Sequence, residues 1–191
     1  MRKIIITWLS CTISIILVAQ NNYIVNAKMS EIVVTGTSTL HDWEMKTNEV
    51  QGKMSGTFTS TAKNISDVQI QCNTSSIKSK DEKVMDEKAH ESLKAKAHPT
   101  IKFAYVSIGE ITTNGNNFNG TITGIMTIAG KSVKVSLPYS GTLSSNGDIN
   151  INSHFSITMS TFGISPPSLM LGSIKVGDKI TIKTKLLLTK Q

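Results

Sequence analysis

Apolar and polar side chains alternate along residues 149–159, which read ININSHFSITM. Only Ser153 interrupts the apolar positions. Because successive side chains of a strand point to opposite faces of a sheet, this alternation is typical of a strand with one dry face and one wet face. The same pattern returns in residues 133–139 and 180–188. The chain is therefore predicted to be an all-β protein.

Most of the remaining chain also divides into short strand-like runs. Further strands are predicted over residues 31–37, 40–47, 49–60, 65–74, 100–112 and 118–129. Glycine-containing pairs typical of hairpin turns separate several runs. These pairs are Asn114-Gly115, Gly130-Lys131 and Asn146-Gly147. Neighbouring strands are therefore expected to be antiparallel.

Residues 79–97, SKDEKVMDEKAHESLKAKA, are the exception, because they are rich in Lys, Glu and Ala, which favour a helix. Ser79 and Glu82 have the spacing of a capping box, and Pro99 prevents the helix from continuing. One helix among many antiparallel strands predicts a closed barrel of about eight strands, because closure removes exposed strand edges. A β-sandwich with an inserted helix is the alternative, and periodicity does not separate the two.

The first 27 residues have the features of a signal peptide. Arg2 and Lys3 precede a long uncharged run, and the sequence Val-Asn-Ala at 25–27 suits cleavage after Ala27. An uncleaved membrane anchor and a lipoprotein modified at Cys11 are the alternatives. Cleavage after Ala27 leaves one barrel domain, residues 28–191, in a periplasmic or secreted protein.

The positive charge of the chain is spread rather than clustered. The sequence has 20 Lys and Arg against 13 Asp and Glu, a net charge of +7. Lysines alternate with Thr in stretches such as residues 179–183, which is typical of solvated strand faces. Spread charge favours at most a transient contact with an anionic membrane surface. No nucleic-acid partner is expected, because a binding stripe needs interleaved aromatic residues and the chain has only 2 Trp, 3 Tyr and 5 Phe.

The residue types that carry catalysis or bind metals are not arranged for either role. His41 and Asp42 are neighbours on a predicted strand, so their side chains point to opposite faces. The predicted end of the helix separates His90 from His98, and His154 approaches His41 only if the tertiary fold brings them together. A hydrolytic or metal-dependent protein needs such convergence. The prediction is a protein that is not an enzyme and has no catalytic residue, metal site or cofactor.

The apolar strand positions are mainly Ile, Val, Leu and Met, with few aromatic residues to fill a barrel. A barrel of about eight strands either fills its interior with side chains or holds one small ligand. The scarcity of bulky residues favours a cavity, with a packed dry core as the alternative. Six methionines are expected to add adaptable lining: Met45, Met54, Met85, Met126, Met159 and Met170. Cys72 is predicted to be a small buried hydrophobic residue.

Residues 162–172, FGISPPSLMLG, are apolar, broken by two prolines and placed between the last two predicted strands. This segment is interpreted as a plug or a crossover packed on the barrel. The alternatives are the mouth of a cavity, or a surface that contacts a membrane or a second copy in a homodimer.

Six signatures, in order along the chain, resemble the YceI family of exported polyisoprenoid-binding proteins. They are TSTLHDW at 37–43, GKMSGTF at 52–58, SIKS at 76–79 leading into the helix, HPTIKF at 98–103, the hairpin from GTITG at 120–124 to IAGK at 128–131, and FGI at 162–164 with VGDKI at 176–180. The resemblance implies a lipocalin-like antiparallel barrel that holds an isoprenoid chain in an elongated apolar cavity.

The sequence departs from the commoner branch of this family at two places. The helix carries Asp86, Glu87 and His90 in an unfamiliar arrangement, and Ser160-Thr161 stand where an arginine precedes the FG pair. Head-group contacts of the better-known members are therefore not transferred to this chain, and a different lipid stays open as an alternative ligand.

The expected function is an exported protein that holds a long apolar, polyisoprenoid-like chain for transport, storage or scavenging. The residues predicted to pack against this lipid are Trp43, Phe58, Phe103, Tyr105, Met126, Phe155 and Phe162. A ligand-free interaction or stress-response module of the same fold is the main alternative, followed by a metal-dependent or hydrolytic enzyme.

Overall fold

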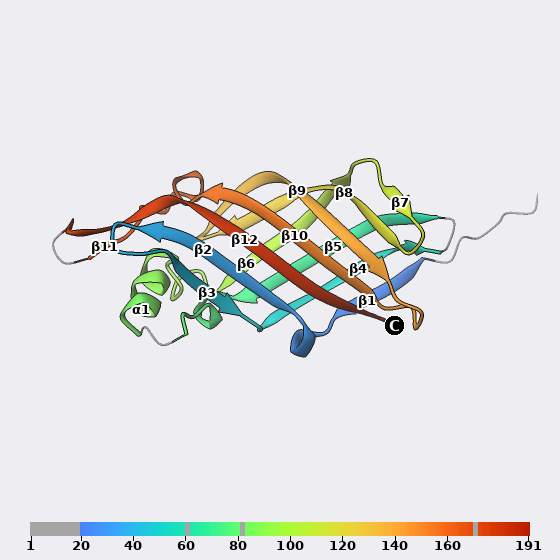
Figure 1. The fold of residues 1–191 in the computed structure, drawn as a ribbon, viewed down its shortest axis with the longest axis horizontal. Helices are drawn as coiled ribbons and strands as arrows, with labels where there is room; N and C mark the ends of the chain where they lie inside the picture. Colours follow the sequence, from blue (N-terminus) through green and yellow to red (C-terminus); the bar gives the residue numbers. More distant parts are fainter. Residues whose placement is uncertain (1–19, 60–61, 81–82, 170–171) are drawn as a thin grey trace, which may run out of the picture.

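The computed structural model describes residues 20–59, 62–80, 83–169 and 172–191, which form a long barrel with one α-helix at one end (Figure 1). The strands are β1 (Asn21–Val25), β2 (Glu31–Ser38), β3 (Trp43–Thr47), β4 (Val50–Phe58), β5 (Lys63–Asn73), β6 (Thr100–Ile108), β7 (Thr112–Asn114), β8 (Asn117–Ile128), β9 (Lys131–Leu143), β10 (Ile149–Thr158), β11 (Ser168–Leu169) and β12 (Ile174–Lys190). The helices are α1 (Lys83–Ser92) and three 3-10 turns, η1 (Ala27–Met29), η2 (Thr74–Ser76) and η3 (Ser160–Phe162).

The barrel wall is an antiparallel meander. Its order is β4-β5-β6-β8-β9-β10-β12, and β1 pairs with both β4 and β12 to close the ring. Beyond β1, β2 continues along β12, and β3 pairs with β2. Because β1 and β2 share one place in the wall and β3 and β4 share the next, the barrel has eight strands. The predicted closed barrel with one helix is confirmed, and the sandwich alternative is wrong.

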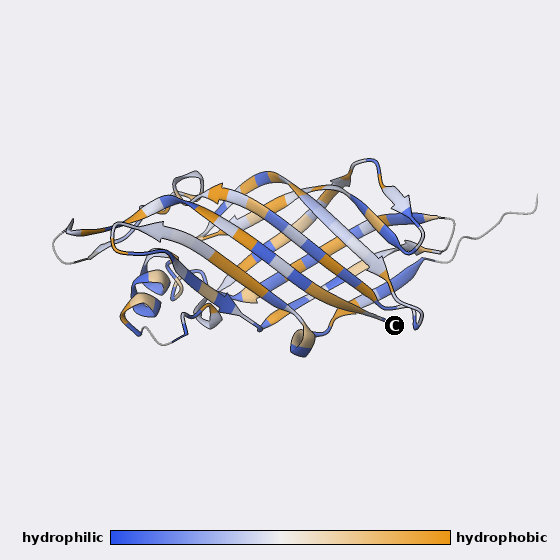
Figure 2. Cartoon of the chain, in the orientation of Figure 1, coloured by the Kyte–Doolittle hydropathy of each residue, from blue (hydrophilic) through white to orange (hydrophobic). Residues whose placement is uncertain are grey.

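Residue alternation decides which side chains face inward. Figure 2 shows hydrophobic and hydrophilic residues alternating along the strands of the wall. In β8 the buried positions are Phe118, Ile122, Gly124, Met126 and Ile128, two or four residues apart. The β8–β9 turn has positive φ angles of 50° at Ala129 and 83° at Gly130, as a tight hairpin turn requires. The predicted hairpin between these long strands is therefore confirmed.

Helix α1 is shorter than predicted, because residues 93–97 form turns rather than a further helical segment. Lys94 has a φ of +52°, which ends the helical geometry before Pro99. The N–H and Oγ of Ser79 both donate to Oδ1 of Asp86, at 2.7 and 2.8 Å. The predicted capping box depends on Glu82, which lies outside the described residues. In the described ranges, no helix has the length and apolar character needed to cross a membrane.

Strand β1 lies inside the segment that was predicted to be a signal peptide. Tyr23 and Val25 are only 1% and 7% exposed, and Asn26 N donates to the carbonyl of Leu187 at 2.8 Å. The barrel therefore begins at Asn21 rather than at residue 28, and cleavage after Ala27 would remove the strand that closes it. This strand is difficult to recognise in the sequence, because its alternating polar and apolar residues directly follow the uncharged run that is typical of a signal peptide.

An aromatic plug, formed by Tyr23, Phe58, Phe118 and Tyr139, fills the β1 end of the barrel. Neighbouring rings in this order have centroids 5.5, 5.4 and 6.2 Å apart, in edge-to-face or tilted contacts. Such contacts stabilise aromatic clusters beyond the burial of their area. Helix α1 lies at the opposite end (Figure 1), so the two ends of the barrel differ in how they are closed.

Because β1 closes the barrel, a substitution at Tyr23 tests this part of the fold. Replacing Tyr23 by Ala removes a plug ring and leaves a void, so the free energy of unfolding should fall by about 3–5 kcal/mol. Ile24→Ala is the matched control, because Ile24 is the next residue of β1 and is 49% exposed; its cost should stay below about 1 kcal/mol. Urea denaturation measures both. Equal losses for the two variants would contradict the inward placement of Tyr23.

Candidate functional site

The barrel encloses an apolar cavity of about 780 Å³. Its deep end reaches Tyr139 of the aromatic plug and Leu188 in the same core cluster. Its other end, here called the mouth, is lined by α1, by the turn at residues 38–43 and by five residues further along the chain: Phe162, Ile164, Pro167, Ile174 and Val176. Leu40 and Val84 line the mouth and are 66% and 62% exposed, so the cavity opens to solvent there.

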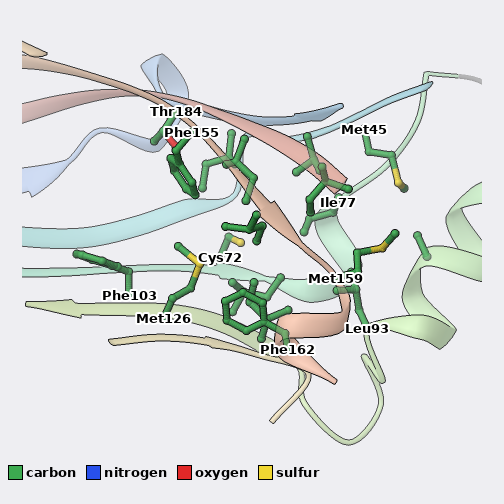
Figure 3. A pocket seen from close by; sticks show the side chains of 18 of the residues that line it. Met45, Cys72, Ile77, Leu93, Phe103, Met126, Phe155, Met159, Phe162 and Thr184 are labelled. Carbon is green, nitrogen blue, oxygen red and sulfur yellow. The ribbon is translucent and has the colours of Figure 1, made fainter. Parts of the chain in front are cut away.

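The inner faces of the strands and one side of α1 supply the lining. Figure 3 shows ten labelled side chains around one space: Met45, Cys72, Ile77, Leu93, Phe103, Met126, Phe155, Met159, Phe162 and Thr184. Strand alternation places β-strand side chains in the cavity at every second position. Met85 and Ala89 reach it from α1, and Leu93 reaches it from the turn that follows, with the spacing of one helical face. The wall is therefore almost entirely hydrocarbon and thioether.

Two inward glycines let aromatic rings lie against the wall instead of across the cavity. Gly36 faces Trp43 across β2 and β3, and a Cβ added to it would lie 2.3 Å from Cζ2 of that ring. A Cβ added to Gly124 would likewise lie 2.3 Å from Cζ of Phe103. Nε1 of Trp43 also donates to the carbonyl of Thr37 at 3.1 Å. The missing side chains leave room for the rings and keep the interior open.

The wall opens between β3 and the following segment, and α1 covers the opening. On the side away from β2, the one described backbone bridge of β3 joins Lys46 to Lys78. Met45 and Ile77 are buried beside this bridge and pack with Met85, Ala89 and Leu93. His90 Nε2 lies 2.8 Å from the carbonyl of Ile77 and ties the helix to the same place. The helix is therefore part of the cavity wall.

Five of the seven residues predicted to pack against a ligand line the cavity: Trp43, Phe103, Met126, Phe155 and Phe162. The structure places the other two elsewhere. Phe58 belongs to the aromatic plug, between Tyr23 and Phe118. Tyr105 packs against the core around the plug, with its hydroxyl 3.5 Å from the carbonyl of Ile65. Alternation identified the inward face of both residues correctly, but it carries no information on depth along the barrel.

The predicted methionine lining is found at Met45, Met54, Met85, Met126 and Met159, whereas Met170 lies outside the described residues. In the segment predicted to be a plug or a mouth, Phe162 and Ile164 are buried and line the cavity together with Pro167. The lining from Ala89, Leu93 and Cys72 was missed. The sequence did contain signals for these residues: Ala89 and Leu93 lie on the apolar face of the predicted helix, and Cys72 occupies an apolar position in the alternation of its strand.

The histidines and carboxylates do not form a reactive cluster. His41 Nδ1 lies 2.7 Å from the main-chain carbonyl of Asp42 rather than from its carboxylate. Across the described ranges, no three His, Cys, Asp or Glu side chains gather as metal ligands would. Burial raises the pKa of Tyr139 to about 12, so this residue stays a neutral phenol in the deep end of the cavity.

Gly36→Ala should displace the ring of Trp43 from the wall. The added Cβ meets only ring atoms of Trp43 within 3.0 Å, so the ring must move and its hydrogen bond to Thr37 is expected to break. Overpacking of this kind costs about 1–3 kcal/mol. The measurement is tryptophan emission together with the urea midpoint. Gly109→Ala is the control, because its Cβ would be no closer than 3.4 Å to a neighbouring atom; a similar change in both variants would contradict the ring placement.

Burial raises the pKa of the Cys72 thiol to about 11. The folded thiol therefore keeps its proton to a higher pH than the unfolded thiol, whose pKa is about 8.5. Its contribution to stability is complete below that value and is lost as the pH rises towards 11. In a Cys11→Ser background, the rate of maleimide labelling of folded Cys72 should keep rising by about tenfold per pH unit beyond pH 9. A labelling rate that levels off near pH 8.5 would contradict the raised pKa. The urea-unfolded chain serves as the reference, because its thiol should show that lower pKa.

Three solved structures are similar to the chain. BcnA of Burkholderia cenocepacia is 19% identical with a TM-score of 0.70, over 86% of this chain and 99% of BcnA. A polyisoprenoid-binding domain of Saccharophagus degradans is 9% identical with a TM-score of 0.69, over 88% of this chain and 98% of the domain. The Campylobacter jejuni YceI protein is 15% identical with a TM-score of 0.54, over 100% and 99%. At these identities the likeness concerns the fold.

No curated protein matches the chain in sequence. A family model, in contrast, matches residues 23–188, which is most of the chain and all eight places in the barrel wall. The match begins within β1, in agreement with the start of the barrel at Asn21. It also confirms the family that the six sequence signatures indicated. The chain belongs to the family of the YceI-like domain.

Proposed function

We propose that this protein is an exported lipid carrier that holds one long apolar, polyisoprenoid-like chain inside the barrel. The observation that carries the proposal is the apolar cavity of about 780 Å³, blocked at one end by the aromatic plug and open at the other. This volume lies within the range of small-molecule sites. The solved Saccharophagus degradans domain described as polyisoprenoid-binding has the same fold, which supports the choice of ligand.

The energetics favour a flexible chain as the ligand. Each methylene group that leaves water contributes about 0.8 kcal/mol, so ten buried methylene groups offer about 8 kcal/mol before the chain is ordered. Methionines such as Met126 and Met159 line the cavity and adapt to chains of different shape, because their side chains are unbranched and flexible. Such a wall selects for length and hydrophobicity rather than for a polar pattern.

Two buried polar groups of the cavity lining fit a protein that binds its ligand without reacting with it. The thiol of Cys72 and the phenol of Tyr139 both have raised pKa values and stay protonated at neutral pH. Protonated groups of this kind are weak nucleophiles. We therefore propose a binding protein rather than an enzyme, with the lipid as its ligand and no cofactor.

Export remains part of the proposal, with a revised processing position. A signal peptide that ends before Asn21 leaves β1 in the barrel, whereas cleavage after Ala27 removes Tyr23 and Val25 from the core. Periplasmic or secreted protein should therefore retain residues 21–27. N-terminal sequencing of the processed protein checks this position, and a mature chain starting at Lys28 would contradict it.

Native mass spectrometry of the protein purified from its own host without detergent tests the proposed ligand. A discrete added mass that transfers into organic solvent as a polyisoprenoid or similar lipid is expected, and the same spectrum separates a monomer from a homodimer. Phe103→Asp should abolish lipid retention, because it places a carboxylate in the apolar wall. Ala104→Asp is the control, since Ala104 is exposed on the outer face beside it. An apo spectrum that persists after polyisoprenoids are offered would refute the proposal.

A further inference from the structure

The described residues include five large hydrophobic side chains that are strongly exposed, and two of them lie at the mouth of the cavity. Leu40 is 66% exposed on the β2–β3 turn, and Val84 is 62% exposed at the start of α1. Both also line the cavity. The other three, Ile24, Met29 and Val106, do not line it. Among the residues that the structure describes, exposed large hydrophobic side chains are therefore continuous with the apolar interior only at the mouth.

The turn that presents Leu40 is held in place by its own hydrogen bonds. The Ser38 hydroxyl oxygen accepts from the N–H groups of Leu40 and His41, at 3.2 and 3.1 Å, and the hydroxyl donates to the carbonyl of His41. Thr39 N donates to the carbonyl of Lys175, and Lys175 N donates to Oγ1 of Thr39. Leu40 is thus fixed outward on an anchored turn, as a binding surface requires.

The charged side chains that line the mouth are cationic. Lys83 and Lys88 line it on α1 on either side of Val84, and no carboxylate belongs to the described lining. Glu91 pairs with Lys88 at 2.8 Å, so these two charges largely offset each other, and Asp86 accepts from Ser79. Lys83 therefore carries the remaining positive charge that α1 brings to the lining. Glu87 of α1 and Asp42 of the β2–β3 turn are also exposed. Hydrophobic contact is therefore the main attraction of the mouth for a partner surface, and its positive charge adds a preference for an anionic one.

We propose that the mouth docks on the surface of a phospholipid bilayer, with anionic head groups favoured. This inference rests on the proposed lipid carriage, because a chain that passes from bilayer to cavity avoids water only if the mouth touches the membrane. Leu40 and Val84 enter the interfacial region, and Lys83 keeps its ammonium group at the level of the phosphates. The bilayer is the occupant that matches both the hydrocarbon and the positive charge of this surface.

The test is cosedimentation of the protein, produced from the full sequence, with phosphatidylglycerol and with phosphatidylcholine vesicles. Wild-type protein should bind both and favour the anionic vesicles. The double variant Leu40→Ser, Val84→Ser should lose at least about tenfold in vesicle affinity. The control double variant Met29→Ser, Val106→Ser changes two exposed hydrophobic residues away from the mouth and should bind as the wild type does. Unfolding midpoints verify that both variants are folded.

Three outcomes would overturn docking: undiminished binding by the mouth variant, an equal loss in the control variant, or no binding of wild type to either vesicle. The last result would leave a protein partner as the occupant of the mouth. Uptake of a fluorescent fatty acid from vesicle-free solution by wild-type protein separates this question from the proposed function. Normal uptake without vesicle binding refutes docking alone, whereas vesicle binding without uptake supports docking and refutes the carrier.

Discussion

Closure of the sheet by β1 is the constraint on which the rest of the structure depends. This strand has only five residues, yet it pairs with β4 on one side and β12 on the other. Without it both neighbours would expose unpaired edges, which favour aggregation. The same strand contributes Tyr23 to the aromatic plug. Backbone closure and a sealed end of the cavity are therefore produced by one short segment near the N-terminus.

Two neighbouring positions in the barrel wall are each occupied by two strands, one position by β1 and β2 and the other by β3 and β4. The two ends of the barrel therefore differ. At the β1 end every neighbouring pair is joined and the interior is filled by rings. At the β3 end the wall is held by the bridge between Lys46 and Lys78 and covered by α1. Side chains of the helix reach inward across this gap, so this end of the cavity stays apolar. The cavity opens at Leu40 and Val84. A cavity with one mouth follows from this arrangement.

Individual residues show which features of the structure the local sequence pattern predicted. The alternation in residues 149–159 correctly identified β10 and its inward Phe155. The same rule placed Phe58 and Phe103 on inward faces, but one is in the plug and the other lines the cavity. Position along the barrel axis depends on the register between strands, which successive side chains do not report. The rings over Gly36 and Gly124 follow from the same cross-strand geometry.

The sequence by itself determined the all-β class, the hairpins, the approximate helix and the inward faces, because these depend on neighbouring residues and on turns that need positive φ angles. Only the tertiary structure decided that residues 21–25 complete the barrel, that the interior is hollow, and that Leu40 and Val84 lie at one mouth. Those features arise from contacts between distant segments. Their geometry depends on strand order, register and closure, which no short stretch of sequence specifies.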